Sequence, residues 1–142
     1  GLARASRRPI AVVATSGTAV VNFAPAVAEA YLGNVPLLVL TTDRPAELRG
    51  IGSTQTLDQV RLFGPHVKWS EEMLLPEATE AAQRDVRAIA ERAVSTALAG
   101  PMGPVHLNFP FREPLLPAPR ASSWEGRSAS WSGWGSVFRW PR

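Results

Sequence analysis

Two short, continuous apolar runs limit what this chain can fold into. Residues 10–14 read IAVVA and residues 36–41 read PLLVLT. Each run is too short for a stable helix and is built from valine, isoleucine and leucine, which is typical of a strand buried on both faces. Because such strands occur in parallel sheets that helices cover on both sides, the two runs predict an α/β domain.

Helix and strand patterns alternate along most of the remaining chain. The expected elements are the end of a helix at 1–6, a helix over 19–32, a short helix over 56–63, an edge strand over 67–73, a long helix over 77–99 and a last strand over 103–110. Pro25 must either kink the helix that contains it or start a second one. This β-α-β-α order predicts a parallel sheet flanked by helices, with ligands at the carboxyl ends of its strands.

Composition narrows the classes of function that the chain can have. The net charge of the 142 residues is +3, and the basic residues, of which only Lys68 is a lysine, are interleaved with acids. A nucleic-acid surface would gather its basic residues on one face, so this class is not favoured. Because the chain has no cysteine, cysteine-based metal sites are excluded and a cytoplasmic protein is expected. No apolar run approaches the ~20 residues of a membrane span.

The first strand is followed by a turn, TSGT, at residues 15–18. A glycine there lets the backbone approach a ligand closely, and the first N–H groups of the next helix point outward. The turn lacks the Gly-Lys-Ser/Thr ending of a P-loop and the glycine spacing of a dinucleotide fingerprint. By spacing alone, an ordinary capped turn is the favoured interpretation, with a phosphate or other polar ligand as the alternative.

A long polar segment, TTDRPAELRGIGSTQ, follows the second strand at residues 41–55. A simple connection would need about two to six residues. Arg44 and Gln55 fall at the expected ligand edge, and an arginine fork suits the carboxylate of a small acidic substrate. Asp43 is expected to orient Arg44 or to cap a turn, and Arg49 is expected to be a solvated surface charge.

The two histidines, His66 and His106, lie far apart, and no acid stands at metal-ligand spacing from either. Both are expected to be structural. The chain also lacks the G-x-S-x-G pattern of a nucleophile elbow. The residues therefore indicate binding without a self-sufficient catalytic set.

Three separated motifs carry a resemblance to a known family. They lie in two stretches: residues 15–77, which begin with TSGTAVVN and contain TTDRPAELRGIGSTQ, and residues 103–117, which read GPVHLNFPFREPLLP. In this order they resemble the pyrimidine-binding domain of thiamine diphosphate-dependent enzymes. Within that family they are most similar to the carboligases of menaquinone biosynthesis, and the resemblance extends over residues 1–117.

The resemblance implies a transferase that decarboxylates 2-oxoglutarate and adds the succinyl unit to isochorismate, with thiamine diphosphate and Mg2+ as cofactors. Such an enzyme is a cytoplasmic homodimer or dimer of dimers that binds no nucleic acid and no membrane. The cofactor lies between two subunits, one of which holds its aminopyrimidine ring.

Site residues follow from the matched motifs. The resemblance assigns the aminopyrimidine to Thr15, Ser16, Gly17, Thr18 and Asn22, and isochorismate to Arg44, Thr54 and Gln55. No residue is assigned a catalytic or metal-binding role. The family's activating glutamate lies upstream of the first motif, and its diphosphate- and metal-binding domain follows the last.

The domain organisation expected from the sequence is a partial pyrimidine-binding domain at 1–117, incomplete at its N-terminus, and an irregular tail at 118–142. The tail holds four of the five tryptophans without any periodicity, which predicts a non-native or disordered segment. We expect the chain to be a fragment that is inactive alone. An unpaired sheet edge predicts poor solubility or self-association.

Two alternatives remain open at this point. One is the pyrimidine-binding domain of another thiamine diphosphate carboligase, of the acetolactate synthase type, although that type generally lacks the arginine segment around Arg44. The other is a non-catalytic binding or dimerisation module derived from such a domain.

Overall fold

The computed structural model describes residues 1–115, of which Gly1–Arg112 form one compact unit. Its centre is a four-stranded parallel sheet in the order β1-β2-β4-β3. The strands are β1 (Ile10–Ala14), β2 (Leu37–Asp43), β3 (Trp69–Glu72) and β4 (Pro104–Pro110). The predicted α/β class and its parallel sheet are thus confirmed, whereas the predicted tail at 118–142 lies outside the described residues.

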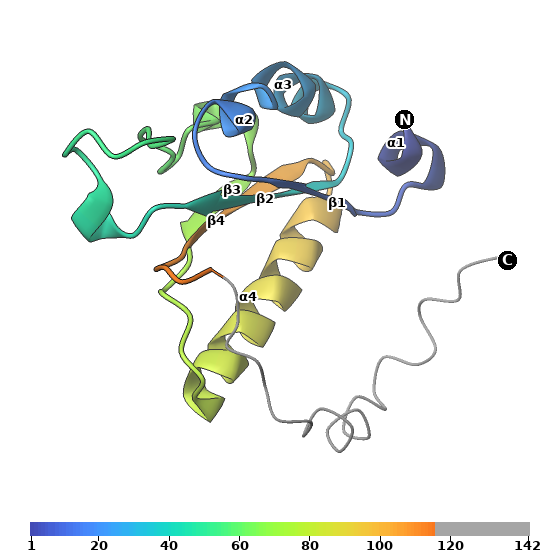
Figure 1. The fold of residues 1–142 in the computed structure, drawn as a ribbon. Coiled ribbons are helices and arrows are strands. Elements are labelled where there is room, and N and C mark those ends of the chain that lie inside the picture. The colour runs from blue at the N-terminus through green and yellow to red at the C-terminus, as the bar shows by residue number, and fades with distance from the viewer. Residues whose placement is uncertain (116–142) are drawn as a thin grey trace, which may run out of the picture. The chain divides into compact units, whose positions relative to one another are not determined.

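Helices cover both faces of the sheet (Figure 1). Helices α2 (Thr18–Val21) and α3 (Ala24–Leu32) lie on one face and α4 (Glu80–Leu98) lies on the other, while the short α1 (Leu2–Ser6) precedes β1. Helices α2 and α3 bury Val20 and Val27 against Val39 of β2, while α4 buries Ala93 and Ala97 against the opposite face. Within residues 1–115 no helix is both long and apolar enough to cross a membrane.

Helix boundaries follow local chemistry. Pro25 lies in the first turn of α3, so the second of its two expected roles, starting a new helix, is confirmed. Helix α4 begins three residues later than expected, because Thr79 is its N-cap and accepts a hydrogen bond from the Ala82 N–H at 3.1 Å.

The expectation that β1 is buried on both faces is wrong. Val13 is 69% exposed, whereas Val12 packs into the core beneath α2 and α3. Strand β1 is an edge strand, and the α4 core contacts β2, β3 and β4 instead. A run of apolar letters does not distinguish an edge strand from a central one, since both carry the same residues.

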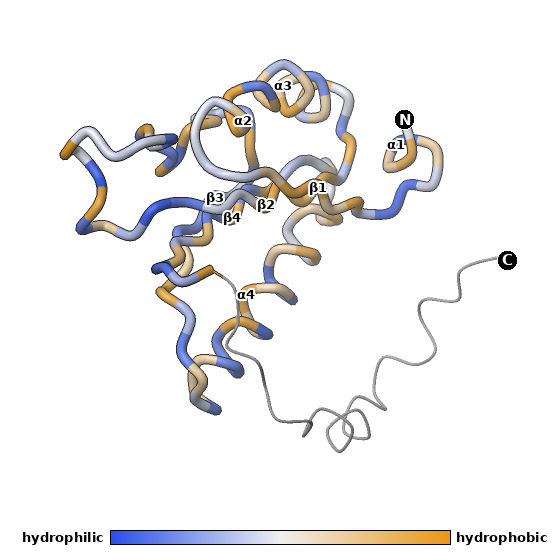
Figure 2. Tube along the Cα trace, viewed as in Figure 1, coloured by the Kyte–Doolittle hydropathy of each residue, from blue (hydrophilic) through white to orange (hydrophobic). Residues whose placement is uncertain are grey.

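The expected helix over residues 56–63 is also wrong. These residues form an irregular segment with turns, followed by a short 3₁₀ helix at Gly64–His66. Gln55 and Arg61 adopt positive φ values of 55° and 56°, which a right-handed helix cannot contain. Figure 2 colours each residue by its hydropathy, but burial does not follow hydropathy in this segment, since the polar Gln59 is buried and the apolar Val60 is exposed.

His106 lies at the centre of the sheet and is fully buried in β4. Its Nε2 is 2.8 Å from Thr41 Oγ1, and its ring meets Phe63 edge to face at 4.8 Å. Thr41 donates its single hydroxyl proton to Asn108, so His106 Nε2 must be the donor to Thr41. Burial lowers the pKa of His106 to about 4. The expectation of a structural histidine is confirmed at this position.

Lys68, the only lysine in the sequence, links the segment before β3 to the C-terminal end of α4. Its Nζ donates to the carbonyl oxygens of Thr96 and Ala99, both at 2.6 Å. These carbonyls belong to the last turn of α4, where the helix dipole places partial negative charge. A cation at the start of β3 therefore fixes the end of the helix that follows it.

We predict that Lys68→Met lowers the free energy of unfolding by about 1–2 kcal/mol, because it leaves two carbonyls at the helix end without their charged donor. Urea unfolding followed by circular dichroism measures the loss. Arg84→Met is the matched control. It removes the positive charge from an exposed ion pair on α4, in which Arg84 lies 3.6 Å from Glu80. That control should change stability by less than about 0.5 kcal/mol. Equal losses in the two variants would contradict the role of Lys68.

His106 makes stability depend on pH. Its pKa is about 4 in the folded chain and that of an ordinary histidine, about 6.5, in the unfolded chain, so unfolding takes up a proton between these values. The stabilisation is complete above pH 6.5 and falls by up to about 1.4 kcal/mol per unit as the pH drops toward 4. The urea midpoint plotted against pH across this range should have a different slope for the unaltered chain and for His106→Gln. The exposed His66, changed to glutamine, is the control that keeps the slope.

Candidate functional site

The turn after β1 and the long loop after β2 meet at one edge of the sheet. Gln55 Nε2 donates to Thr15 Oγ1 at 3.0 Å and to the carbonyl oxygen of Ser16 at 3.1 Å. Strands β1 and β2 are parallel neighbours, so their carboxyl ends lie side by side and the segments that follow them come together. The structure thus joins one member of the predicted substrate set to the predicted cofactor turn.

Gly17 is required where these two segments touch. Its φ is 81°, and a Cβ at this position would lie 2.9 Å from Gln55 Cγ and 3.1 Å from the Gln55 carbonyl oxygen. Both the left-handed backbone and the close approach exclude a larger residue. Because Gly17 is also buried, the turn is packed beneath Gln55 rather than free in solvent.

A buried glutamine holds the same turn from below. Gln59 is 1% exposed, and its Oε1 accepts a hydrogen bond from the Gly17 N–H at 2.7 Å. Its Nε2 donates to the carbonyl oxygen of Thr42 at 2.9 Å and to Asn108 Oδ1 at 3.0 Å. One amide group therefore connects the turn after β1 with the ends of β2 and β4.

Asn108 extends this network across the sheet. In the register of the sheet it lies beside Thr41, whose hydroxyl donates to Asn108 Oδ1 at 2.8 Å. Asn108 Nδ2 in turn donates to Asp43 Oδ2 at 2.8 Å. The three side chains are almost completely buried, so each hydrogen bond removes the penalty of an unpaired polar group in the core.

The network ends in a chain of charges. Arg49 Nη2 lies 2.9 Å from Asp43 Oδ2, and Arg49 Nη1 lies 2.6 Å from Glu72 Oε1. The approach to Asp43 is a charge contact without the alignment of a hydrogen bond, while Arg49 Nε donates to the Arg44 carbonyl oxygen at 3.0 Å. The expectation that Arg49 is a solvated surface charge is therefore wrong. Its side chain is 21% exposed and links the loop to β3.

Asp43, expected to orient Arg44 or to cap a turn, contacts two arginines. Its carboxylate accepts from the backbone N–H of Arg44 at 2.7 Å, and its Oδ2 lies 2.9 Å from Nη2 of Arg49. The loop then forms a 3₁₀ turn at Ala46–Leu48, where Glu47 is bridged by Arg112. That hydrogen bond from Arg112 lowers the pKa of Glu47.

The remaining predicted site residues are distributed over this edge. Ser16 and Gly17 are buried, Arg44 is half-buried, and Thr15, Thr18, Asn22, Thr54 and Gln55 are exposed. Thr18 opens helix α2 and Asn22 ends it, so both follow the turn directly. The Thr54 carbonyl accepts from Thr56 Oγ1 at 3.0 Å, which shapes the loop around Gln55.

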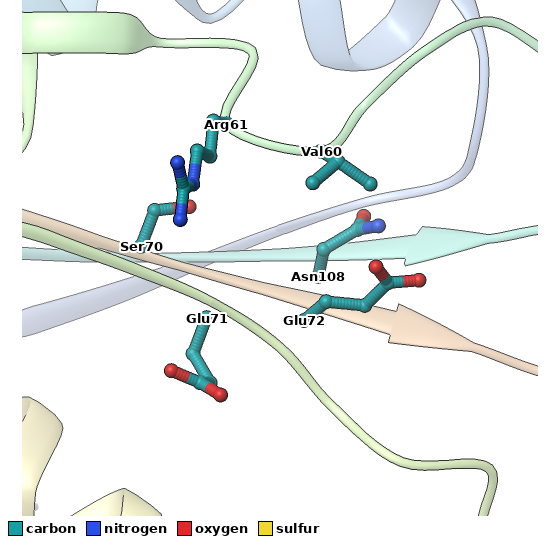
Figure 3. Close-up of a pocket in the computed structure, with 6 residues that line it drawn as sticks. All are labelled: Val60, Arg61, Ser70, Glu71, Glu72 and Asn108. Atoms are coloured by element: carbon teal, nitrogen blue, oxygen red, sulfur yellow. The ribbon is translucent and has the colours of Figure 1, made fainter.

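Two hollows flank the site. One, of about 430 Å³, opens to solvent within the loop itself and is lined by Arg49, Ser53, Thr56 and Asp58, among others. The second, of about 250 Å³, lies between the crossover and β3, and Figure 3 shows Arg61 above Ser70, with Asn108 near Val60 and Glu72. Arg44 lines neither hollow, although the matched motif places a substrate contact on it.

Sequence reasoning missed Gln59 and Asn108. Asn108 carried a usable signal, because it alternates with His106 within an apolar strand and therefore marks a buried polar face. Gln59 carried none, since its place in an apparent amphipathic helix disguised a buried side chain.

Comparison with known proteins agrees with this geometry. Residues 1–62 match the family described as "Thiamine pyrophosphate enzyme, N-terminal TPP binding domain". The chain is 53% identical over 125 residues to the 2-succinyl-5-enolpyruvyl-6-hydroxy-3-cyclohexene-1-carboxylate (SEPHCHC) synthase of Geobacillus kaustophilus, an alignment that covers 88% of this chain and 22% of that synthase. It is 56% identical over 117 residues to the synthase of the same name from Bacillus cytotoxicus, covering 82% and 20% of the two chains.

The chain spans about one fifth of the length of the curated relatives that it matches. A third relative, from Listeria monocytogenes, has the same name and is 55% identical over 117 residues, covering 82% of this chain and 20% of the relative. The parallel sheet and the glycine turn after β1 are consistent with these similarities. The chain carries the N-terminal cofactor-binding domain of the thiamine diphosphate-dependent enzymes, matched over residues 1–62, and the three relatives named here are SEPHCHC synthases.

Proposed function

We propose that this chain is the pyrimidine-binding part of a thiamine diphosphate- and Mg2+-dependent transferase that decarboxylates 2-oxoglutarate and adds the succinyl unit to isochorismate. The enzyme acts in the cytoplasm as a homo-oligomer, and the 142 residues alone carry no turnover. The names of the relatives favour this proposal over an acetolactate synthase-type carboligase.

The observation that carries the proposal is the contact of Gln55 with the turn. Two segments assigned to different ligands, the cofactor and the second substrate, are joined by its hydrogen bonds to Thr15 and Ser16. A carboligase requires this arrangement, since the acceptor must lie within reach of the activated cofactor.

The residues at this edge fit an aminopyrimidine ring. Gly17 brings its backbone unusually close to a neighbouring segment, while Thr15, Thr18 and Asn22 are exposed beside it and present hydroxyl and amide groups. These groups can donate to ring nitrogens and accept from an exocyclic amine. When bound, thiamine diphosphate supplies the carbon nucleophile for decarboxylation of the 2-oxo acid.

The loop after β2 serves the second substrate. Isochorismate carries carboxylates, and the guanidinium of Arg44 is a planar fork that matches a carboxylate in two hydrogen bonds. Arg44 follows β2 directly, and its backbone is fixed on both sides by Asp43 and Arg49. Thr54 and Gln55 close the same loop and add polar contacts near the turn.

We predict that the 142-residue chain binds 4-amino-5-hydroxymethyl-2-methylpyrimidine, which is the aminopyrimidine half of the cofactor without its diphosphate. A ¹H–¹⁵N NMR titration should shift the amides of residues 15–18 and 22. Gly17→Ala should abolish these shifts, because a methyl group there collides with Gln55.

Gly50→Ala is the matched control for this titration. Gly50 also has a positive φ, of 72°, but a Cβ there would meet nothing within 4 Å. The control therefore places a Cβ at a second glycine with positive φ without the collision, and it should bind as the unaltered chain does. Binding by Gly17→Ala, or no binding by the unaltered chain, would contradict the assignment of the turn.

The substrate assignment is tested in a chimera. Residues 1–115 replace the matching stretch of the Geobacillus kaustophilus synthase, and the carboligation rate is measured at varied isochorismate. We predict an active chimera in which Arg44→Lys raises the KM for isochorismate about tenfold or more, since lysine cannot form the bidentate contact. The KM for 2-oxoglutarate should stay within about twofold of the unaltered chimera.

Arg84→Lys, on the exposed face of α4, is the control and should leave both KM values unchanged. An inactive chimera with an intact fold would favour a non-catalytic module. Equal rises in the two KM values on Arg44→Lys would remove Arg44 from the isochorismate site.

A further inference from the structure

We infer that Gln59 is the positioning residue of the cofactor turn, which it holds at a fixed distance from the loop that carries the substrate residues. This inference rests on the function proposed above. Gln59 lies within the stretch 15–77 that carries the family resemblance, but the resemblance assigned it no role.

The orientation of the Gln59 amide is determined by its surroundings. Its oxygen faces one donor, the Gly17 N–H, and its nitrogen faces two acceptors, the carbonyl oxygen of Thr42 and Asn108 Oδ1. A flipped amide would place N–H against N–H and oxygen against two oxygens. All of its hydrogen-bonding capacity except one oxygen lone pair is therefore used, in one arrangement only.

Those contacts fix the turn relative to strands that it does not follow. The Gly17 N–H comes directly before α2, where a helix leaves its first N–H groups without intrahelical partners. Gln59 satisfies this buried donor and is itself attached to β2 and β4. The height of the turn above the sheet edge is thus set by the length of one glutamine side chain.

The same amide reaches the substrate loop through Asn108. Asn108 donates to Asp43, and Asp43 holds both the backbone of Arg44 and the guanidinium of Arg49. Gln59 therefore lies between the turn assigned to the cofactor and the start of the loop assigned to isochorismate. Gln55 also joins these two segments, through its hydrogen bonds to Thr15 and Ser16.

Gln59→Met tests the inference, because methionine keeps the length and burial of the side chain and removes its donor and acceptor. In the 142-residue chain we expect the Gly17 amide resonance to move upfield and its hydrogen exchange to accelerate about tenfold or more. Affinity for 4-amino-5-hydroxymethyl-2-methylpyrimidine should fall about tenfold, measured by the same NMR titration.

Val39→Ala is the control for a purely structural role. Val39 is fully buried in β2 and has no polar contact with the turn, so its loss lowers stability without touching Gly17. At a temperature where both variants are folded, Val39→Ala should keep its affinity within about twofold. Equal losses of affinity in the two variants, or an unchanged affinity in Gln59→Met, would overturn the inference.

A measurement on the unaltered chain tests the hydrogen bond without requiring that a variant folds. The hydrogen bond predicts a scalar coupling between the Gly17 amide nitrogen and the Gln59 side-chain carbonyl carbon, and its absence would overturn the contact. If the unaltered chain does not bind the pyrimidine, the proposed function fails together with the ligand part of the inference. The Gly17 exchange rate in Gln59→Met then still decides whether Gln59 holds the turn.

Discussion

The structure depends on pairing the polar groups buried at the carboxyl ends of its central strands. Thr41, Asp43 and Asn108 are almost fully buried there, beside the carboxamide of Gln59. An unpaired group of this kind costs about 1–3 kcal/mol, so the side chains are arranged to satisfy one another in a continuous network. A satisfied network of this type is rigid, and it gives the loops above it a fixed base.

Rigidity at this edge matters for the function proposed above. A site that binds a cofactor and a second substrate must hold two groups of residues at a fixed separation, and loops alone do so poorly. Here the turn after β1 is held by Gln59 from the sheet and by Gln55 from the loop. The exposed groups of Thr15 and Thr18 are therefore presented by a turn whose backbone is held from two sides.

The sequence predicted the architecture better than the details of the site. The apolar runs identified β1 and β2, a last strand was expected over residues 103–110 where β4 lies, and the start of α3 was one of the two roles expected for Pro25. The order of strands could not be read from the chain, which is why β1 was expected to be covered on both faces. Arg49 was assigned to solvent for a similar reason, since its partners Asp43 and Glu72 belong to different strands.

The missing helix between β2 and β3 follows from the same constraint. Residues 44–68 must return from the carboxyl edge of the sheet to its amino edge, a path that parallel folds usually cover with a helix. Here Gln59 is held at the strand ends while Phe63, four residues later, packs in the core beneath α2 and α3. The positive φ values of Gln55 and Arg61 turn the chain on either side of Gln59, so that its side chain enters the core. A helix across this segment would remove both turns and with them the hydrogen bond to Gly17, which explains why an amphipathic sequence here remains irregular.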